Sequence, residues 1–519
     1  MASRQQQLYQ LKAGLDAGRL TDQLVELGTW RSGEPVSSSL TFFDSFDWRL
    51  HAAGTSLCGE TMAEESQIVW HDLQTGAPRI AQSGEVPRFV WGLPDGELRQ
   101  QLTPLLEMRA LLPLATLQRT RQPLALLDNL GKTVLRVYLD QLAVISSDPG
   151  HVQELPLLLS SEPLKGYPKP AARLARLLAG KQLARETSDL FSQTMAALGL
   201  QPGRYSSKLE IDLDPALPAR EALRRILHRL LQTMAANEDG TRRDLDSEFL
   251  HDFRVAVRRT RSALGQLKKV LPAALLQRMR EEFAWLGQIT GPTRDLDVYL
   301  LNFTDYRDSL PAEVRADLDP LHAFLQRHQR QEQRLLVRRL NSRRYHALIA
   351  EWQEWLDTPA DDWVENAELP IGQLAGERIS KTFQLVLKEG TAITDDSPAS
   401  ELHELRKTCK KLRYLLEFFQ SLYPAGKIRR LVKALKGLQD NLGTFQDLSV
   451  QAETLRRCAR QMAAEGEAPP ATLLAMGMLV DHLLQRELLC REEFAERFAG
   501  FSSPGNRRLF NELLSCKEN

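Results

Sequence analysis

The pattern of hydrophobic and polar residues changes near residue 200. Before that point, short β-rich runs such as 40–43 and 134–139 are bounded by Gly, Pro and Asp, which is typical of strands. Segments 95–108 and 171–200 carry apolar residues at helical spacing. Beyond about residue 220 the helical pattern continues with few breaks, most of them at prolines. The pattern predicts an α+β unit followed by an all-α unit.

A segment rich in Pro and Asp separates these two units. Residues 212–218 are Asp-Leu-Asp-Pro-Ala-Leu-Pro, and they predict a linker over residues 201–218. We expect residues 1–200 to form the first domain and residues 219–519 the second. A chain of 519 residues is long enough for two to four domains with buried cores.

The helical part contains an internal repeat. The segment His251–Arg261, HDFRVAVRRTR, resembles His403–Arg413, HELRKTCKKLR, at an offset of 152 residues. The same offset, without a gap, also matches Pro272 with Pro424, Gly291 with Gly443 and Asp295 with Asp447. One unchanged offset over this length predicts a duplicated helical unit, with halves at about 219–365 and 370–515.

Each repeated segment, folded as an α-helix, places its basic residues on one face. The first stripe contains His251, Arg254, Arg258 and Arg261, and the second contains His403, Arg406, Lys410 and Arg413. Each stripe spans about 80° of the helix and about 15 Å of its length. Leu and Phe occupy the opposite face, so we expect one side to be buried and the other to present cations. Arg donates paired hydrogen bonds to phosphate oxygens.

These stripes allow two interpretations. A basic run on a single helix is most often a solvated face, but its duplication at matching positions favours a binding surface. Nearby acids, Asp295, Asp297 and Asp447, could be metal ligands or bases. We favour the interpretation that they neutralise and orient the arginines.

Net charge alone hides this arrangement. Lys and Arg number 67 and so do Asp and Glu, which at first argues against a polyanion partner. However, segment 403–436 has ten basic residues against two acids, whereas segment 351–368 has seven acids and no Lys or Arg. Segment 327–344 is also basic, with seven Lys or Arg against one acid. Neutrality is therefore an average over segregated charge, and it is compatible with a local phosphate groove.

Composition excludes several classes of protein. The chain is 43% hydrophobic and 26% charged, which excludes a mostly disordered protein. The five cysteines include no C-x-x-C pair, which disfavours cysteine-held zinc and a disulfide scaffold. No stretch of eighteen apolar residues predicts a membrane span, and the first residues lack a secretion signal. We therefore expect a cytoplasmic protein without a membrane partner.

The two His-x-x-Arg-x-x-x-basic-basic-x-Arg helices resemble the signature of the CHAD family, the conserved histidine α-helical domain, over roughly residues 215–515. The resemblance implies two pseudo-symmetric helical bundles around a basic pore or groove that binds inorganic polyphosphate, often on polyphosphate granules. The positions that would bind polyphosphate are His251, Arg254, Arg258, Arg259, Arg261, His403, Arg406, Lys407, Lys410, Lys411 and Arg413. The second copy has Lys410 and Lys411 where the first has arginines, which keeps the charge but loses bidentate geometry.

The first 200 residues resemble a degenerate CYTH domain, the antiparallel triphosphate-tunnel fold often fused to CHAD units. Segment Thr41–Leu57 is similar to that family's Phe-Asp-Thr-x-Asp…Leu-x-x-x-Gly-x-x-Leu strand pair, and Arg119–Arg121 and Val137–Asp140 resemble later strands. The family's catalytic Glu-x-Glu-x-Lys is missing, because Leu8–Lys12 keeps only the lysine. Without the paired glutamates that would hold Mg²⁺ or Mn²⁺, we expect a non-catalytic scaffold. A structural domain without any ligand is equally compatible with the sequence.

The leading hypothesis is therefore a non-enzymatic polyphosphate-binding protein with no catalytic residue, no metal and no cofactor. One alternative is a metal-dependent triphosphatase or polyphosphatase that uses Lys12 and Arg121 in the first domain. Another is a nucleic-acid-binding protein. Nucleic acid is disfavoured because aromatic residues that could stack on bases are sparse beside the stripes, with Tyr414 nearest in the second helix and none in the first.

Overall fold

The structure is a computed structural model that describes residues 7–12, 17–145, 152–186, 189–267, 269–358 and 363–515. It divides into two compact units, residues 1–206 and residues 207–519. None of the helices in the described ranges is both long and apolar enough to span a membrane.

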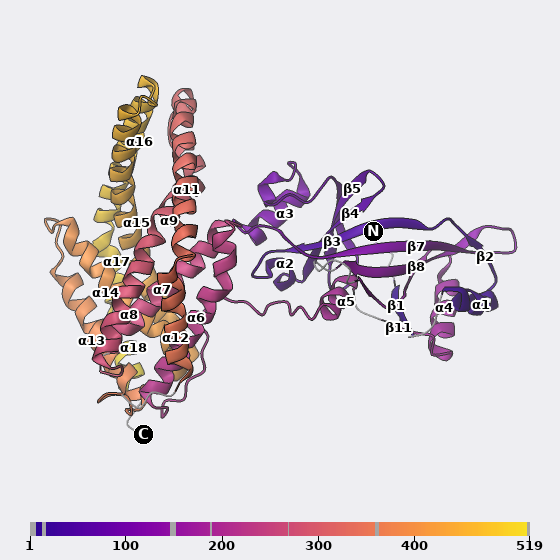
Figure 1. Ribbon diagram of the computed structural model, residues 1–519, viewed down its shortest axis with the longest axis horizontal. Coiled ribbons are helices and arrows are strands. Elements are labelled where there is room, and N and C mark those ends of the chain that lie inside the picture. Colours follow the sequence, from indigo (N-terminus) through magenta and orange to yellow (C-terminus); the bar gives the residue numbers. More distant parts are fainter. Residues whose placement is uncertain are drawn as a thin grey trace. The chain divides into compact units, whose positions relative to one another are not determined.

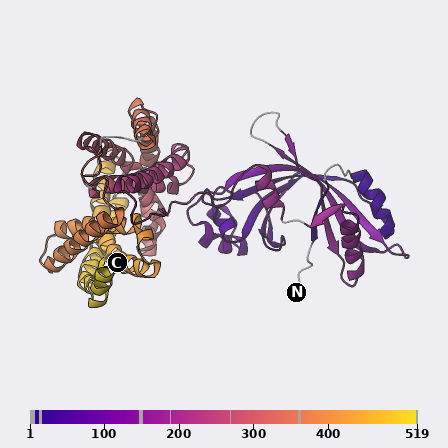
Figure 2. The same ribbon diagram turned by 90° about the horizontal axis from the view of Figure 1, so that it is seen from below.

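The first unit is built on an antiparallel sheet (Figures 1 and 2). Its strands are β1 (Gln7–Leu11), β2 (Thr29–Ser32), β3 (Val36–Asp44), β4 (Thr55–Met62), β5 (Glu65–Asp72), β6 (Pro78–Ser83), β7 (Leu112–Leu127), β8 (Thr133–Ile145), β9 (Val152–Glu154), β10 (Leu158–Pro163) and β11 (Ala184–Glu186). Their order is β11-β1-β10-β8-β7-β3-β4-β5-β6, with β2 paired to β7 and β9 paired to β8. Figure 2 shows this sheet curved into an arch.

Short helices cover parts of this sheet. They are α1 (Ala17–Leu24), α2 (Arg49–Ala52), α3 (Glu97–Leu106), α4 (Pro168–Gly180) and α5 (Leu190–Ala197), with 3-10 turns at Val25–Leu27 and Val90–Gly92. The prediction of a helix over segment 171–200 was wrong, because α4 ends at Gly180 and α5 begins only at Leu190. Gln182 adopts a positive φ of 51°, which ends the helical path, and the chain then adds β11 to β1.

The long hairpin of β7 and β8 forms the centre of the sheet. Its turn is stabilised by Asp128, whose carboxylate accepts hydrogen bonds from the backbone N–H groups of Leu130 and Lys132. Gly131 occupies the positive-φ position of the turn. Alternate residues of the strands are buried, as in β3, so one face of the sheet packs on apolar side chains.

The second unit is helical (Figure 1). Its helices are α6 (Ala219–Arg242), α7 (Ser247–Gln266), α8 (Ala273–Ile289), α9 (Gly291–Leu301), α10 (Phe303–Asp308), α11 (Asp319–Leu340), α12 (Arg343–Asp357), α13 (Ile371–Ala392), α14 (Ala399–Phe418), α15 (Ala425–Ala464), α16 (Pro470–Glu492), α17 (Phe494–Phe501) and α18 (Pro504–Ser515), with 3-10 turns at Ala312–Leu318 and Gln420–Leu422. The predicted order, an α+β unit with an antiparallel sheet followed by a helical unit, is confirmed.

The two halves of the helical unit meet at positions related by the repeat offset. Pro218 and Pro370, the residues before α6 and α13, form an isolated antiparallel bridge. The Tyr299 hydroxyl donates a hydrogen bond to the carbonyl oxygen of Gln451 at 3.1 Å. Both pairs are 152 residues apart, which is the geometry expected where a pseudo-twofold axis passes between duplicated halves.

Most helices share one large apolar core, and a smaller core lies between α9, α10, α11, α15 and α16. Part of the segment predicted as a linker belongs to the large core, since Leu209 and Leu213 are buried in it. The Leu213 N–H also bonds to the Ser421 hydroxyl. Residues 207–218 therefore pack with the helical unit.

Close packing of α6 on α7 depends on Gly240. A Cβ atom at this position would overlap the ring of Phe249, which is fully buried. We expect Gly240→Ala to lower the free energy of unfolding by about 1–3 kcal/mol, because overpacking outweighs the gain in helix propensity. The matched control is Gly437→Ala on α15, where a Cβ meets nothing within 4 Å, and which should be neutral or stabilising. Urea denaturation gives the free energy of unfolding of both variants. Equal changes in the two variants would contradict the prediction.

Candidate functional site

Helices α7 and α14 carry the two predicted stripes, and each helix buries its opposite face. Phe253 and Val257 of α7, and Leu405 and Leu412 of α14, all belong to the large core. The start of α7 is fixed by Asp246, whose carboxylate accepts hydrogen bonds from the N–H groups of Glu248 and Phe249. Burial of the apolar faces leaves the basic faces of α7 and α14 lining cavities.

One cavity, of about 820 Å³, is walled by α7, α8, α13 and α14. We call it the all-basic cavity because its lining includes eight Lys or Arg side chains and no acid. They are Arg258, Arg261, Arg280, Arg378, Lys381, Lys407, Lys410 and Lys411. Within the described part of the chain only Lys407 of these eight forms an ion pair, with Glu404 at 2.8 Å. The other seven charges are therefore available to an external anion.

A second cavity, of about 640 Å³, shares Arg258, Lys410 and Tyr414 with the first. We call it the mixed-charge cavity, because its lining contains six Lys or Arg and four acids. The basic residues are Lys208, Arg258, Arg259, Arg406, Lys410 and Arg413, and the acids are Asp252, Glu417, Asp440 and Asp447. His251 also lines it. Arg258 and Lys410 occupy equivalent positions of the two repeats, so the two stripes converge on a shared wall.

Glu417 distinguishes the two cavities. Its carboxylate accepts hydrogen bonds from Arg259 at 2.8 Å and from Arg413 at 2.6 Å. The side chains of Arg259 and Glu417 are only 13% and 15% exposed, so this interaction is weakly screened by solvent. The equivalent position in the first repeat is Gly265, which lines the all-basic cavity. One substitution between the repeats thus neutralises two predicted binding residues.

Three other predicted residues form polar contacts between helices. Arg254 donates to the Gly287 carbonyl at 3.2 Å and to the Thr290 hydroxyl at 2.9 Å, which ties α7 to the end of α8. Burial lowers the pKa of Arg254 to about 10, so it remains charged at neutral pH. Arg406 binds Asp447 at 3.0 Å, and His403 Nδ1 lies 2.7 Å from Gln446 Oε1. Neither Arg254 nor His403 lines either cavity.

Lys410 is half-buried in the wall between the two cavities. Burial, followed by repulsion from Arg406 and Arg258, lowers its pKa to about 8. An ammonium group held among other cations gains more from an added anion than an isolated surface lysine does. Lys410 therefore lies where cations of the two stripes come together.

Three cations of the all-basic cavity were not predicted from the sequence. Arg280 lies on α8, and Arg378 and Lys381 lie on α13. The spacing of Arg378 and Lys381 places them on one helix face, but their surroundings in the sequence do not resemble the repeated stripe. Only the packing of α13 beside α14 brings them to the site.

The acids near the stripes differ in their contacts. Asp447 binds Arg406, whereas Asp297 accepts a hydrogen bond from Gln329 at 3.0 Å. Burial raises the pKa of Asp297 to about 7 and also raises the pKa of Asp295. No group of three or more His, Cys, Asp or Glu with a metal-binding arrangement occurs among the residues that the structure describes.

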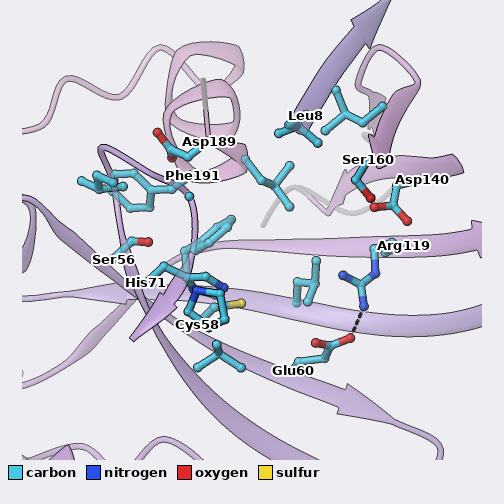
Figure 3. A pocket seen from close by; sticks show the side chains of 18 of the residues that line it. Leu8, Ser56, Cys58, Glu60, His71, Arg119, Asp140, Ser160, Asp189 and Phe191 are labelled. Atoms are coloured by element: carbon cyan, nitrogen blue, oxygen red, sulfur yellow. Dashed lines mark hydrogen bonds and ion pairs between the residues drawn. The ribbon is translucent and has the colours of Figure 1, made fainter. Parts of the chain in front are cut away.

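The curved sheet of the first unit encloses a separate cavity of about 660 Å³ (Figure 3). We call it the sheet cavity. Arg121 lines it but forms a two-point ion pair with Asp140, both bonds being 2.7 Å. Arg119 is bound to Glu60 and to the Ser38 hydroxyl. Lys12, the lysine retained at the expected catalytic strand, is exposed beyond the end of β1 and does not line this cavity.

The helical unit is similar to known proteins. Residues 225–456 match the family model described as CHAD domain. Among solved structures, the CHAD domain from the plant Ricinus communis is 27% identical with a TM-score of 0.49, and the match covers 58% of this chain and 98% of that one. PptA from Streptomyces chartreusis is 16% identical with a TM-score of 0.43, covering 54% and 99%.

The first unit also has structural neighbours. HpAC1 from Hippeastrum, described as having a dominant triphosphatase activity, is 12% identical with a TM-score of 0.28, covering 39% of this chain and 99% of that one. No curated protein matches this sequence. The family-model match includes both stripe helices in full. The helical unit of this chain therefore contains a CHAD domain.

Proposed function

We propose that the helical unit binds inorganic polyphosphate, or a similar linear polyanion, in the all-basic cavity. The observation that carries this proposal is that eight cations from four helices line one cavity without an acid among them. Each phosphate of such a chain carries charge and acceptor oxygens, which match Arg and Lys donors at close spacing. The bound chain would reach the mixed-charge cavity past Arg258 and Lys410.

The lining favours polyphosphate over nucleic acid. Tyr414 is the only aromatic residue among the lining side chains of the two basic cavities, all of which are described. Single-stranded nucleic acid gains much of its affinity by stacking bases on aromatic rings, and one tyrosine provides little stacking surface. A polyphosphate chain has no bases to stack, so its affinity depends on contacts with the cations and not on aromatic rings.

We also propose that the first unit is not a catalyst and that the protein resides in the cytoplasm on polyphosphate granules. The support for the first point is that both arginines of the sheet cavity are already neutralised, Arg119 by Glu60 and Arg121 by Asp140. The second point follows from the proposed polyphosphate ligand. Release of phosphate from tripolyphosphate with Mg²⁺, lost in Arg121→Ala, would instead favour a triphosphatase.

A salt series tests the proposed ligand. We expect the logarithm of the affinity for long-chain polyphosphate to fall linearly with the logarithm of the salt concentration, with a slope of roughly −5 if most of the eight cations contact phosphate. In competition, RNA with the same number of charges should displace polyphosphate poorly. Fluorescence anisotropy with labelled polyphosphate measures both. A slope near zero, or equal competition by RNA, would contradict the proposal.

Binding should also depend on pH through Lys410. Below about pH 7 this lysine is charged with or without ligand, so it contributes no pH dependence to the affinity. Above pH 8 the free protein has lost the proton and binding must take it up again, so the affinity falls by up to about one log unit per pH unit. The groups that surround Lys410 electrostatically are Arg258 on α7, Arg406 and Arg413 on α14 and Asp447 on α15.

The matched control for this pH dependence is Lys410→Arg, because a guanidinium keeps its charge to a higher pH than an ammonium group does. Anisotropy titrations between pH 7 and pH 10 should show a decline for the natural protein and a nearly flat profile for the variant. The same decline in both proteins would show that Lys410 does not contact the ligand.

A further inference from the structure

The sheet cavity has a lining unlike that of the basic cavities. Apolar side chains, including Phe42, Leu158 and Phe191, form much of its wall. In the view of Figure 3, His71, Asp189 and Phe191 lie on one side of it, and Arg119, Asp140 and Ser160 lie on the other. A cavity of about 660 Å³ with apolar walls and a few polar groups has the size and character of a small-molecule site.

The charges in this cavity do not favour an anion. Glu60 and Asp140 neutralise Arg119 and Arg121, which leaves the carboxylate of Asp189 as the unbalanced charge. Asp189 also caps α5, because its oxygens accept hydrogen bonds from the N–H and the hydroxyl of Ser192. Among the described residues it forms no ion pair. A phosphate in this cavity would be repelled by Asp189, whereas a cation would be attracted.

Two polar groups of the lining lack partners within the described residues. Ser160 is 1% exposed, and its hydroxyl makes no hydrogen bond with these residues. The Nδ1 atom of His71 is also buried and also makes no hydrogen bond with them. Burial lowers the pKa of His71, so its ring is neutral at neutral pH and can accept a hydrogen bond. Buried polar atoms without partners are costly unless a ligand or water satisfies them.

Aromatic rings complete the side of the cavity that holds the unbalanced carboxylate. Phe42 and Phe191 meet edge to face at 5.4 Å between ring centroids. Aromatic faces attract organic cations, and they also accept the apolar body of a small molecule. Carboxylate, neutral imidazole and aromatic rings together match one chemical group, a protonated amine on an apolar body.

We propose that the sheet cavity binds a small organic amine, with its ammonium group between Asp189 and His71 and its apolar body against Phe42 and Phe191. This site is distinct from the proposed polyphosphate site, since all of its lining belongs to the first unit. The Ser160 hydroxyl at the other side offers a hydrogen bond to a polar group at the far end of the ligand.

Binding of 4-fluorophenethylamine to the full chain tests this proposal, with ¹⁹F line broadening as the readout. We expect saturable binding with a dissociation constant of about 1 mM or below. The uncharged alcohol 2-(4-fluorophenyl)ethanol should bind at least tenfold more weakly. Tripolyphosphate, which under the proposed function binds the helical unit, should not displace the amine.

Two variants separate this site from nonspecific binding. Asp189→Asn should weaken amine binding at least tenfold while keeping the cap of α5, since Asn caps helices as well as Asp. Ala81→Trp, at an exposed position of the lining on β6, should reduce binding by filling the cavity. Absence of saturable binding, equal affinity of Asp189→Asn, or displacement by tripolyphosphate would each overturn the proposal.

Discussion

Simultaneous charge reversal of Arg261, Lys381 and Lys411 should lower the affinity for polyphosphate about 100-fold, because each exposed phosphate contact contributes roughly 1 kcal/mol. These residues come from α7, α13 and α14 and all line the all-basic cavity. All three are exposed and have no ion-pair partner in the described ranges, so the fold should tolerate their replacement by Glu. Anisotropy titration at fixed salt gives the affinity, and thermal unfolding verifies the fold.

The matched control reverses Arg330, Arg334 and Arg338 of α11. They are also exposed, they produce the same change in net charge, and they do not line either basic cavity. The control should lose no more than a few-fold in affinity, through the long-range field alone. If both triple variants lose the same affinity, binding follows overall charge and the all-basic cavity is not the site.

Replacement of Glu417 by Gln should have two opposite effects. The free energy of unfolding should fall by about 2–3 kcal/mol, because Arg259 stays buried without its carboxylate. The affinity for polyphosphate should rise about tenfold, because Arg259 and Arg413 become available and the mixed-charge cavity becomes more positive. Urea denaturation and anisotropy titration measure the two effects.

Glu404→Gln is the control for this variant. Glu404 forms an ion pair with Lys407, just as Glu417 pairs with two arginines. The side chains of Glu404 and Lys407, however, are both largely exposed. We expect no measurable change in stability, since exposed ion pairs contribute little. An unchanged polyphosphate affinity in Glu417→Gln would mean that the bound chain does not extend into the mixed-charge cavity.

The sequence predicted the two stripes because duplication leaves a signal within one chain, and the resemblance to the CHAD family implied that they line one groove. Arg258 and Lys410 match at the repeat offset, and the helical period puts the apolar residues behind them in the core. The stripe did not predict which cations remain available. Arg254 and Arg406 lie in the same stripes as Arg258 and Lys410, and Arg259 was predicted to bind beside them. Each of these three arginines, however, bonds to a protein group that only the folded chain brings near.

Other features also depended on contacts between distant segments. Arg378 and Lys381 reach the cavity through the packing of α13 on α14, and Glu417 meets Arg259 from the other repeat. In the first unit, the periodicity of segment 171–200 indicated a helix, but pairing of β11 with β1 outweighs that local preference. The loss of the paired glutamates could be seen in the sequence, whereas the pairing of Arg121 with Asp140 required the sheet.

The most direct test of the central claim is a crystal structure of the chain with a short polyphosphate. The account predicts electron density for a phosphate chain between α7, α8, α13 and α14, with phosphate oxygens within hydrogen-bond distance of Arg258, Arg261 and Lys410. Density for the phosphate chain elsewhere, with the all-basic cavity left empty at saturating ligand, would contradict it.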